Sequence, residues 1–137
     1  MMRRRRVLVV DDTRFFRAAL SGLLREQGWE VLEAQDGRVA LEIARAELPA
    51  LDIMILDLQM PEVDGFEVLQ QLRSDEAGRK VPVLALSGAE LPSDEIERLH
   101  ALGATDYINK ADGLPQVGER LEKLLGGPET DQAEPGE

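Results

Sequence analysis

LDIMILD, at residues 51–57, is a strand-sized apolar run that ends in an aspartate. Two further runs of this kind are VLVV at 7–10 and VPVLALS at 81–87. Runs that are apolar at nearly every position are typical of strands buried on both faces, as in a parallel sheet covered by helices. WEVLEA at 29–34 and TDYIN at 105–109 complete the set. The sequence therefore predicts five strands around one core.

Amphipathic segments with a helical repeat of apolar residues follow each of these runs. Their apolar stripes lie within residues 16–27, 39–44, 68–72, 96–102 and 114–125. Strands that alternate with helices imply right-handed crossovers between parallel strands. We therefore predict an α/β fold, a doubly wound (βα)5 sandwich with a five-stranded parallel sheet.

Length and composition set the domain organisation. The 137 residues are close to one ordinary domain, which we place at 1–126. Residues 127–137 contain Gly, Pro and acidic residues without an apolar stripe, so we expect a disordered acidic tail. No output domain is expected after the fifth helix. A protein of this size would act by docking on a partner.

Charge and cysteine usage exclude several classes of protein. The net charge of −11 argues against a broad nucleic-acid surface, and RRRR at 3–6 is interpreted as a solvated lead-in to the first strand. The absence of cysteine excludes a disulfide scaffold and a thiolate metal site, and favours the cytoplasm. No apolar run has the length of a membrane span, so no membrane insertion is expected.

Polar residues follow four of the expected strands where each strand ends. They are Asp11 and Asp12, Asp57, Ser87 and Lys110. Ligands of open parallel sheets bind outside the carboxyl ends of the strands, so these side chains are expected to converge. Three carboxylates repel one another unless a cation joins them, and Mg²⁺ prefers such oxygen ligands. An ammonium and a hydroxyl would then stabilise a transferring phosphoryl group, with an ionised aspartate as the nucleophile.

Each of these residues also has an ordinary structural interpretation. Asp12 would serve as the N-cap of the first helix, Asp57 as a turn residue, and Ser87 with Gly88 as a turn. Lys110 would be a solvated surface charge. The coincidence of all of them at strand ends favours a phosphoryl site over these separate explanations.

Four segments of the chain resemble the receiver domains of bacterial response regulators, especially the chemotaxis type. They are VLVVDDTRFFR at 7–17, MILDLQMPEVDGFEVL at 54–69, LALSG at 84–88 and GATDYINK at 103–110. The resemblance covers residues 5–125. It implies a flavodoxin-like fold with strand order 2-1-3-4-5, in a phosphoprotein of a two-component phosphorelay system.

The resemblance implies a role for each residue of the phosphoryl site. Asp57 accepts a phosphoryl group from the phosphohistidine of a sensor histidine kinase. Mg²⁺ is held by Asp11, Asp12, Asp57 and the backbone carbonyl of Gln59. Such a domain is not an enzyme, apart from its own phosphorylation and slow autodephosphorylation, whose rate Gln59 and Ala89 would tune.

The resemblance also implies a conformational switch. Ser87 and Lys110 bind the phosphoryl oxygens, and Tyr107 turns inward when Ser87 moves. A downstream target protein would then bind the face made by the fourth helix, the fifth strand and the fifth helix. Tyr107 has an alternative interpretation as a half-buried ring at the sheet edge.

One position departs from the family pattern. The family usually has proline after the active-site lysine, whereas Lys110 is followed by Ala111. A cis peptide before a residue other than proline costs about 2.5–4 kcal/mol, so a trans peptide is expected here. The loop at 110–114 is therefore expected to be reshaped or looser.

Three other functions compete with a phosphorylated receiver. A haloacid-dehalogenase phosphatase needs a second acid two residues after its nucleophile, where this chain has Gln59. A nucleotide or flavin binder needs a glycine-rich phosphate loop, and neither usual motif occurs. A phosphorylation-independent interaction module, or a phosphate sink, remains open. His100 is interpreted as a surface residue, and Trp29 as a packing residue far from the site.

Overall fold

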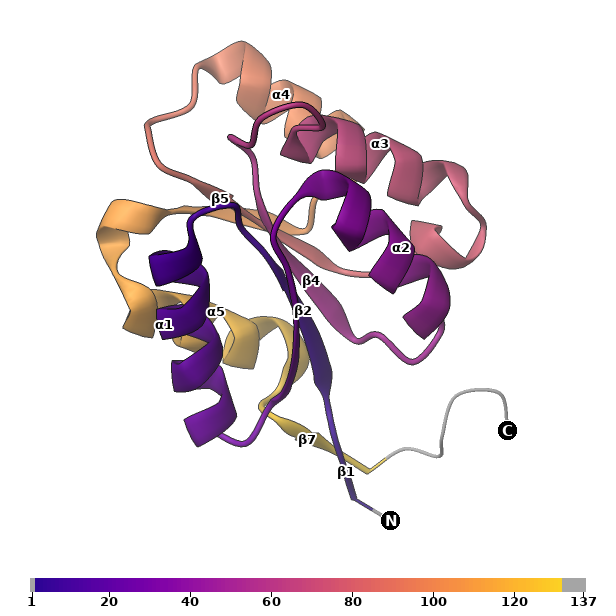
Figure 1. The fold of residues 1–137 in the computed structure, drawn as a ribbon, viewed down its shortest axis with the longest axis vertical. Helices are drawn as coiled ribbons and strands as arrows, with labels where there is room; N and C mark the ends of the chain where they lie inside the picture. The colour runs from indigo at the N-terminus through magenta and orange to yellow at the C-terminus, as the bar shows by residue number, and fades with distance from the viewer. Residues whose placement is uncertain (1, 132–137) are drawn as a thin grey trace.

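The computed structural model describes residues 2–131, and a five-stranded parallel sheet forms its centre (Figure 1). The strands of this sheet are β2 (Arg6–Val10), β3 (Glu30–Ala34), β4 (Ile53–Asp57), β5 (Val83–Ser87) and β6 (Asp106–Asn109). Their order is β3-β2-β4-β5-β6, and every neighbouring pair is parallel. Because a short β1 (Arg3–Arg4) precedes them, this order is the predicted 2-1-3-4-5. The predicted fold class is confirmed.

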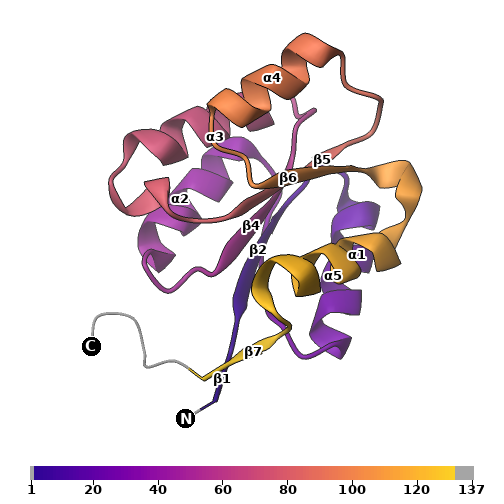
Figure 2. The same ribbon diagram turned by 180° about the vertical axis from the view of Figure 1, so that it is seen from behind.

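Helices cover both faces of the sheet, as the two opposite views show (Figures 1 and 2). The helices are α1 (Arg14–Glu26), α2 (Gly37–Glu47), α3 (Gly65–Ser74), α4 (Ser93–Ala101) and α5 (Leu114–Leu125), with short 3₁₀ turns η1 (Ala77–Arg79) and η2 (Lys110–Asp112). Helices α2, α3 and α4 lie on one face, and α1 and α5 lie on the other. The side chains form two matching core clusters, one on each side of the sheet.

The apolar runs form strands because both of their faces are covered. All five residues of β4 and all five of β5 are buried, and only the last residue of each, Asp57 and Ser87, is polar. Trp29, directly before β3, is only 1% exposed and packs in the core cluster beneath α1 and α5. His100 is exposed on α4, as expected.

Two aspartates and a glycine fix the loops that surround the carboxyl end of the sheet. Asp36 caps α2 by accepting a hydrogen bond from the Val39 amide at 2.8 Å, and Asp64 caps α3 in the same way through the Glu67 amide at 3.0 Å. Gly65 then lets α3 begin against the end of β4, since a Cβ there would lie 2.5 Å from the Asp57 carbonyl oxygen.

The disorder expected from Gly127 onward is wrong for the part of that segment that the structure describes. Strand β7 (Glu129–Thr130) pairs with β1 in an antiparallel ribbon, with Arg3 opposite Thr130. The Arg5 amide adds a hydrogen bond to the Pro128 carbonyl at 2.8 Å. The rest of the expected tail, 132–137, lies outside the described residues.

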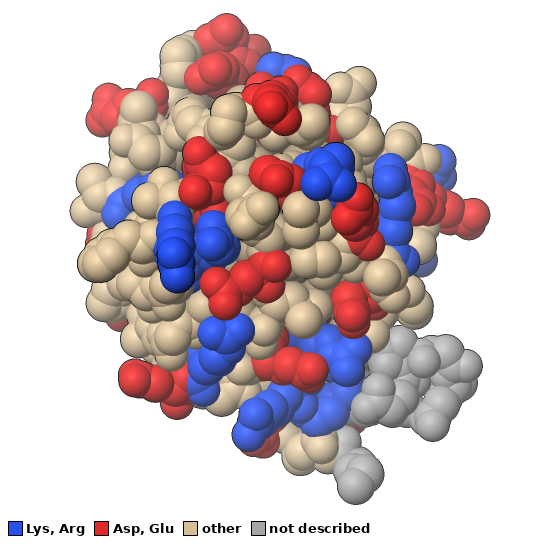
Figure 3. All heavy atoms as spheres, in the orientation of Figure 1, with Lys and Arg blue, Asp and Glu red and all other residues tan. Residues whose placement is uncertain are grey.

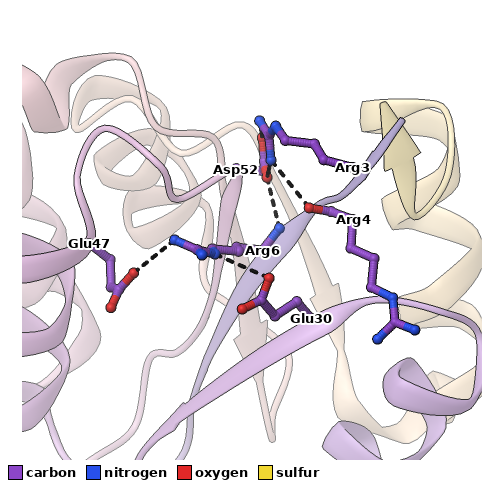
Figure 4. Close-up of polar contacts among 6 residues, drawn as sticks. All are labelled: Arg3, Arg4, Arg6, Glu30, Glu47 and Asp52. Carbon is purple, nitrogen blue, oxygen red and sulfur yellow. Dashed lines mark hydrogen bonds and ion pairs between the residues drawn. The ribbon is translucent and has the colours of Figure 1, made fainter. Parts of the chain in front are cut away.

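The arginines of the N-terminal segment are also more than a solvated lead-in (Figure 4). Arg3 donates to both carboxylate oxygens of Asp52, at 3.0 and 3.1 Å, and the Arg6 amide donates to the same carboxylate at 2.7 Å. The Arg6 guanidinium contacts Glu30 and Glu47, each at 3.2 Å. The acids that face these arginines come from β3, α2 and the loop before β4, which is why the sequence spacing gave no sign of them.

On the face drawn in Figure 3, acidic and basic side chains are interspersed. Within residues 2–131, every helix is too short or too polar to cross a lipid bilayer.

Candidate phosphoryl and metal site

The predicted site residues meet at the carboxyl end of the sheet. Asp11 and Asp12 directly follow β2, Asp57 is the last residue of β4, and Lys110 directly follows β6. Each of the three aspartates offers a carboxylate oxygen, and these oxygens all lie within 4.8 Å of one another. Lys110 joins the cluster, because its Nζ lies 2.7 Å from Asp11 Oδ2 and 3.4 Å from Asp57 Oδ2.

Backbone amides orient the two buried carboxylates. The Thr13 amide donates to Asp11 Oδ1 at 2.8 Å, and the Gln59 amide donates to Asp57 Oδ1 at 3.1 Å. In both residues the other oxygen, Oδ2, then faces Lys110. Asp11 is fully buried and Asp57 is 2% exposed, so neither carboxylate is solvated by bulk water.

The pKa of the Asp57 carboxyl is raised from its ordinary value of 3.8 to about 7, chiefly by burial and next by the neighbouring Asp11 charge. The Lys110 ammonium and the Gln59 amide lower the pKa in part, while Asp12 adds to the increase. One ammonium therefore does not balance three carboxylates, and the cluster as a whole carries excess negative charge.

This donor set fits a hard divalent cation. Asp12 is exposed and its side chain is free of the helix, since the N-cap of α1 is Thr13 with no side-chain capping bond. The N-cap interpretation of Asp12 is therefore wrong. Oxygen ligands with room for water on one side are what Mg²⁺ prefers, and a second positive charge would relieve the repulsion that raises the pKa of Asp57.

Ser87, at the end of β5, is 1% exposed and lies beside Gln59 rather than standing in an isolated turn. Its Oγ donates to the Ala89 carbonyl and accepts from the Ala89 amide at 3.2 Å. Gln59 Nε2 donates to the same Oγ at 3.1 Å, and Gln59 Oε1 accepts from the Gly88 amide at 2.9 Å. These side-chain contacts could not be predicted from sequence spacing, because they depend on how the loops after β4 and β5 meet.

Tyr107 lies at the sheet edge with 37% of its surface exposed. It borders a hollow of about 550 Å³ whose lining also includes Ser87, Ala89 and Ile108. The ring is thus neither fully buried nor fully in solvent. Space lies between it and the end of β5.

Sequence reasoning missed one residue that shapes the site. Phe16 was expected only as part of the apolar stripe of α1. The Lys110 Nζ lies 4.6 Å from the centre of the Phe16 ring, a cation–π contact that helps to hold the ammonium over the carboxylates. An aromatic residue one turn after an acidic pair is the only sequence signal for this role.

The loop after Lys110 is ordered by a backbone hydrogen bond that a proline at position 111 could not donate. The only cis peptide within residues 2–131 precedes Pro49, so the Lys110–Ala111 peptide is trans, as expected. The Ala111 amide, which proline lacks, donates to Asn109 Oδ1 at 2.9 Å and begins η2. The departure from the family pattern therefore gives a capped turn rather than a looser loop.

Comparison with known protein families gives one match over most of the chain. Residues 7–122 match the family described as the response regulator receiver domain. Response regulator MprA of Mycolicibacterium vanbaalenii is 41% identical over 120 residues, which are 88% of this chain and 50% of that protein. The chain thus spans about half the length of this curated relative. The polar-differentiation response regulator DivK of Brucella ovis is 33% identical over 88% of this chain and 95% of its own length.

Solved structures agree with this match. Chemotaxis protein CheY4 of Vibrio cholerae superposes with a TM-score of 0.82 at 31% identity, over 90% of this chain and all of that one. The receiver domain of the histidine kinase CKI1 from Arabidopsis thaliana, solved in complex with Mg²⁺, superposes with a TM-score of 0.74 at 29% identity, over 88% of this chain and 91% of its own.

Proposed function

This chain belongs to the response regulator receiver family, and on that premise we propose that Asp57 is its phosphoryl acceptor. The observation that supports this choice most strongly is the position of Lys110, whose Nζ lies between the Oδ2 atoms of Asp11 and Asp57. Of these two buried carboxylates, Asp57 lies between the strands that carry the acidic pair and the hydroxyl, because β4 pairs with β2 on one side and with β5 on the other.

The proposed reaction is a direct transfer between two side chains. An ionised Asp57 oxygen attacks the phosphorus of a phosphohistidine on a sensor histidine kinase. A new O–P bond forms as the P–N bond breaks, and the electron pair of that bond leaves with the imidazole nitrogen. Lys110 and the Ser87 hydroxyl stabilise the charge on the phosphoryl oxygens.

The metal in this proposal is Mg²⁺, held by Asp11, Asp12, Asp57 and the carbonyl of Gln59. Bound there, it would neutralise carboxylate and phosphoryl charge during the transfer. Support comes from the excess negative charge of the cluster, and from a structural relative that was solved with this ion. The chain's own part is to hold the Asp11 and Asp57 carboxylates apart from bulk water and to keep Lys110 beside them.

The signal would pass through Ser87 and Tyr107. We propose that the phosphoryl group draws the Ser87 hydroxyl towards it, and that Tyr107 then moves into the hollow of about 550 Å³ beside it. The face formed by α4, β6 and α5 would change shape and bind a downstream target protein. This is a population shift between two conformations, driven by a local change of charge.

The relatives of this chain are named for more than one cellular process. Receiver domains of this family act between histidine kinases and their targets. A chemotaxis role is supported by the likeness to CheY4, whereas DivK is named for polar differentiation and MprA only as a response regulator. We propose a cytoplasmic signalling protein with no catalytic activity beyond its own phosphorylation and slow autodephosphorylation.

Intact-mass spectrometry tests this proposal. Wild type incubated with Mg²⁺ and acetyl phosphate should gain one phosphoryl group, and a chelator should prevent the gain. Asp57→Asn should gain none, whereas Asp94→Asn, which alters an exposed aspartate on α4, should behave like wild type. Equal labelling of Asp57→Asn would refute the assignment, and no labelling of wild type would favour a phosphorylation-independent interaction module.

A further inference from the structure

The side chain of Gln59 connects the loop after β4 to the end of β5. Its Nε2 donates to Ser87 Oγ at 3.1 Å, and its Oε1 accepts from the Gly88 amide at 2.9 Å. Both ends of the carboxamide are therefore engaged, and both contacts lie on the segment that would have to move in a Ser87 switch. Although the Gln59 side chain is exposed, its polar atoms are directed to this one segment.

These contacts use the full hydrogen-bonding capacity of the Ser87 hydroxyl. A hydroxyl has one proton to donate and two lone pairs to accept with. The proton goes to the Ala89 carbonyl, and the lone pairs take the Ala89 amide at 3.2 Å and Gln59 Nε2. A phosphoryl oxygen is an acceptor only, so it can bind Ser87 only after the proton has left Ala89.

We propose that the Gln59 carboxamide is a latch, a positioning residue that holds Ser87 and Gly88 in the unphosphorylated arrangement and so sets how readily the domain switches. This inference rests on the proposed function, because it takes Ser87 as the hydroxyl that moves to the phosphoryl group. It assigns the Gln59 side chain a role separate from that of its backbone carbonyl, which every substitution at this position retains.

The latch has a measurable consequence. Together, two neutral hydrogen bonds to one moving segment favour the unphosphorylated arrangement over the switched one by about tenfold. A ligand that binds only the switched arrangement must overcome that factor. Removing the latch should therefore make such a ligand bind about tenfold more tightly, although no contact to the ligand has been added.

Beryllium fluoride with Mg²⁺ is a suitable probe, since it imitates the acyl phosphate and is not hydrolysed. Changes in the hydrolysis rate then cannot imitate the effect of the latch. Tyr107 is the only tyrosine in the chain, so incorporation of 3-fluorotyrosine gives one fluorine resonance that reports its environment. Titration of this resonance yields both the affinity and the fraction of switched protein.

Two variants distinguish the loss of the Gln59 hydrogen bonds from the loss of its side-chain volume. Gln59→Leu keeps the size of the side chain and removes both hydrogen bonds, whereas Gln59→Ala removes the bulk as well. We expect both to bind the probe about tenfold more tightly than wild type. In a Ser87→Ala background the effect of Gln59→Leu should shrink, because half of the latch has no partner there.

The outcomes are distinct. If wild type binds the probe and Gln59→Leu binds it with the same affinity, the latch is refuted and the phosphoryl site stands. The latch is also refuted if Gln59→Leu raises the affinity for the probe equally in the wild-type and Ser87→Ala backgrounds. Gln59 would then act through another group. If wild type gives no fluorine shift at any probe concentration, the proposed function itself fails, and the latch fails with it.

Discussion

Replacement of Asp57 by asparagine should stabilise the metal-free protein, and the gain should depend on pH. The Asp57 carboxyl has its pKa raised from 3.8 to about 7, first by burial and then by the Asp11 charge. A carboxyl whose pKa is higher in the folded state than in the unfolded state opposes folding once it ionises. This penalty is absent below about pH 3.8 and is complete above about pH 7.

The size of the effect follows from the two pKa values. A change from 3.8 to about 7 corresponds to about 4 kcal/mol, at about 1.4 kcal/mol per pKa unit. At pH 4.5 the penalty is about 1 kcal/mol by the same relation. The free energy of unfolding of Asp57→Asn relative to wild type should therefore increase by about 3 kcal/mol between pH 4.5 and pH 8. The loss of the carboxylate leaves Lys110 paired with Asp11 at 2.7 Å.

Urea unfolding at the two pH values, in the presence of a chelator, measures this difference. Asp94→Asn is the matched control, because it makes the same chemical change at an exposed aspartate on α4 and removes no buried charge. Addition of millimolar Mg²⁺ at pH 8 should raise the stability of wild type, because the ion would bind the carboxylate that the variant lacks. The difference in free energy of unfolding between wild type and Asp57→Asn should therefore become smaller. A gap between wild type and Asp57→Asn that is independent of pH would refute the reasoning.

The contacts described above also predict the effects of substitutions at Asp52, at two glycines and at Lys110. Asp52→Asn should lower the free energy of unfolding by about 1–3 kcal/mol in urea, because Arg3 and the Arg6 amide lose a shared charged acceptor; an unchanged midpoint would contradict this. Gly65→Ala should lower the free energy of unfolding by about 2 kcal/mol or more, since its Cβ would meet the Asp57 carbonyl. Gly22→Ala has nothing within 4 Å of its Cβ, so it should raise the free energy of unfolding by about 0.5–1 kcal/mol. Equal effects in the two glycine variants would count against the packing of α3 on β4. Lys110→Met should slow phosphorylation by acetyl phosphate by about 100-fold, measured by intact mass, and a rate near that of wild type would remove Lys110 from the site.

The sheet and the position of the site could be predicted from the sequence because burial on two faces leaves a strong pattern. The apolar runs that became β2, β4 and β5 mark the centre of the sheet, and the rule for strand ends brought Asp11, Asp57 and Lys110 together. Their chemical roles remain predictions.

Other features left no such pattern. The two-residue strands β1 and β7 carry no apolar alternation, so the tail from Gly127 was expected to be disordered. The pairing of Arg3 with Asp52 joins residues far apart in the sequence. The contacts of Gln59 with Ser87 depend on the approach of two loops, and sequence spacing does not report such an approach.

The most direct test of the account is to identify the residue that carries the phosphoryl group. Wild type phosphorylated by acetyl phosphate and Mg²⁺ can be reduced with borohydride, which converts an aspartyl phosphate to homoserine, and the peptides can then be sequenced by mass spectrometry. We expect homoserine at position 57 and unmodified aspartate at positions 11 and 12. Homoserine at either of those positions, or none in a protein that has gained a phosphoryl group, would contradict it.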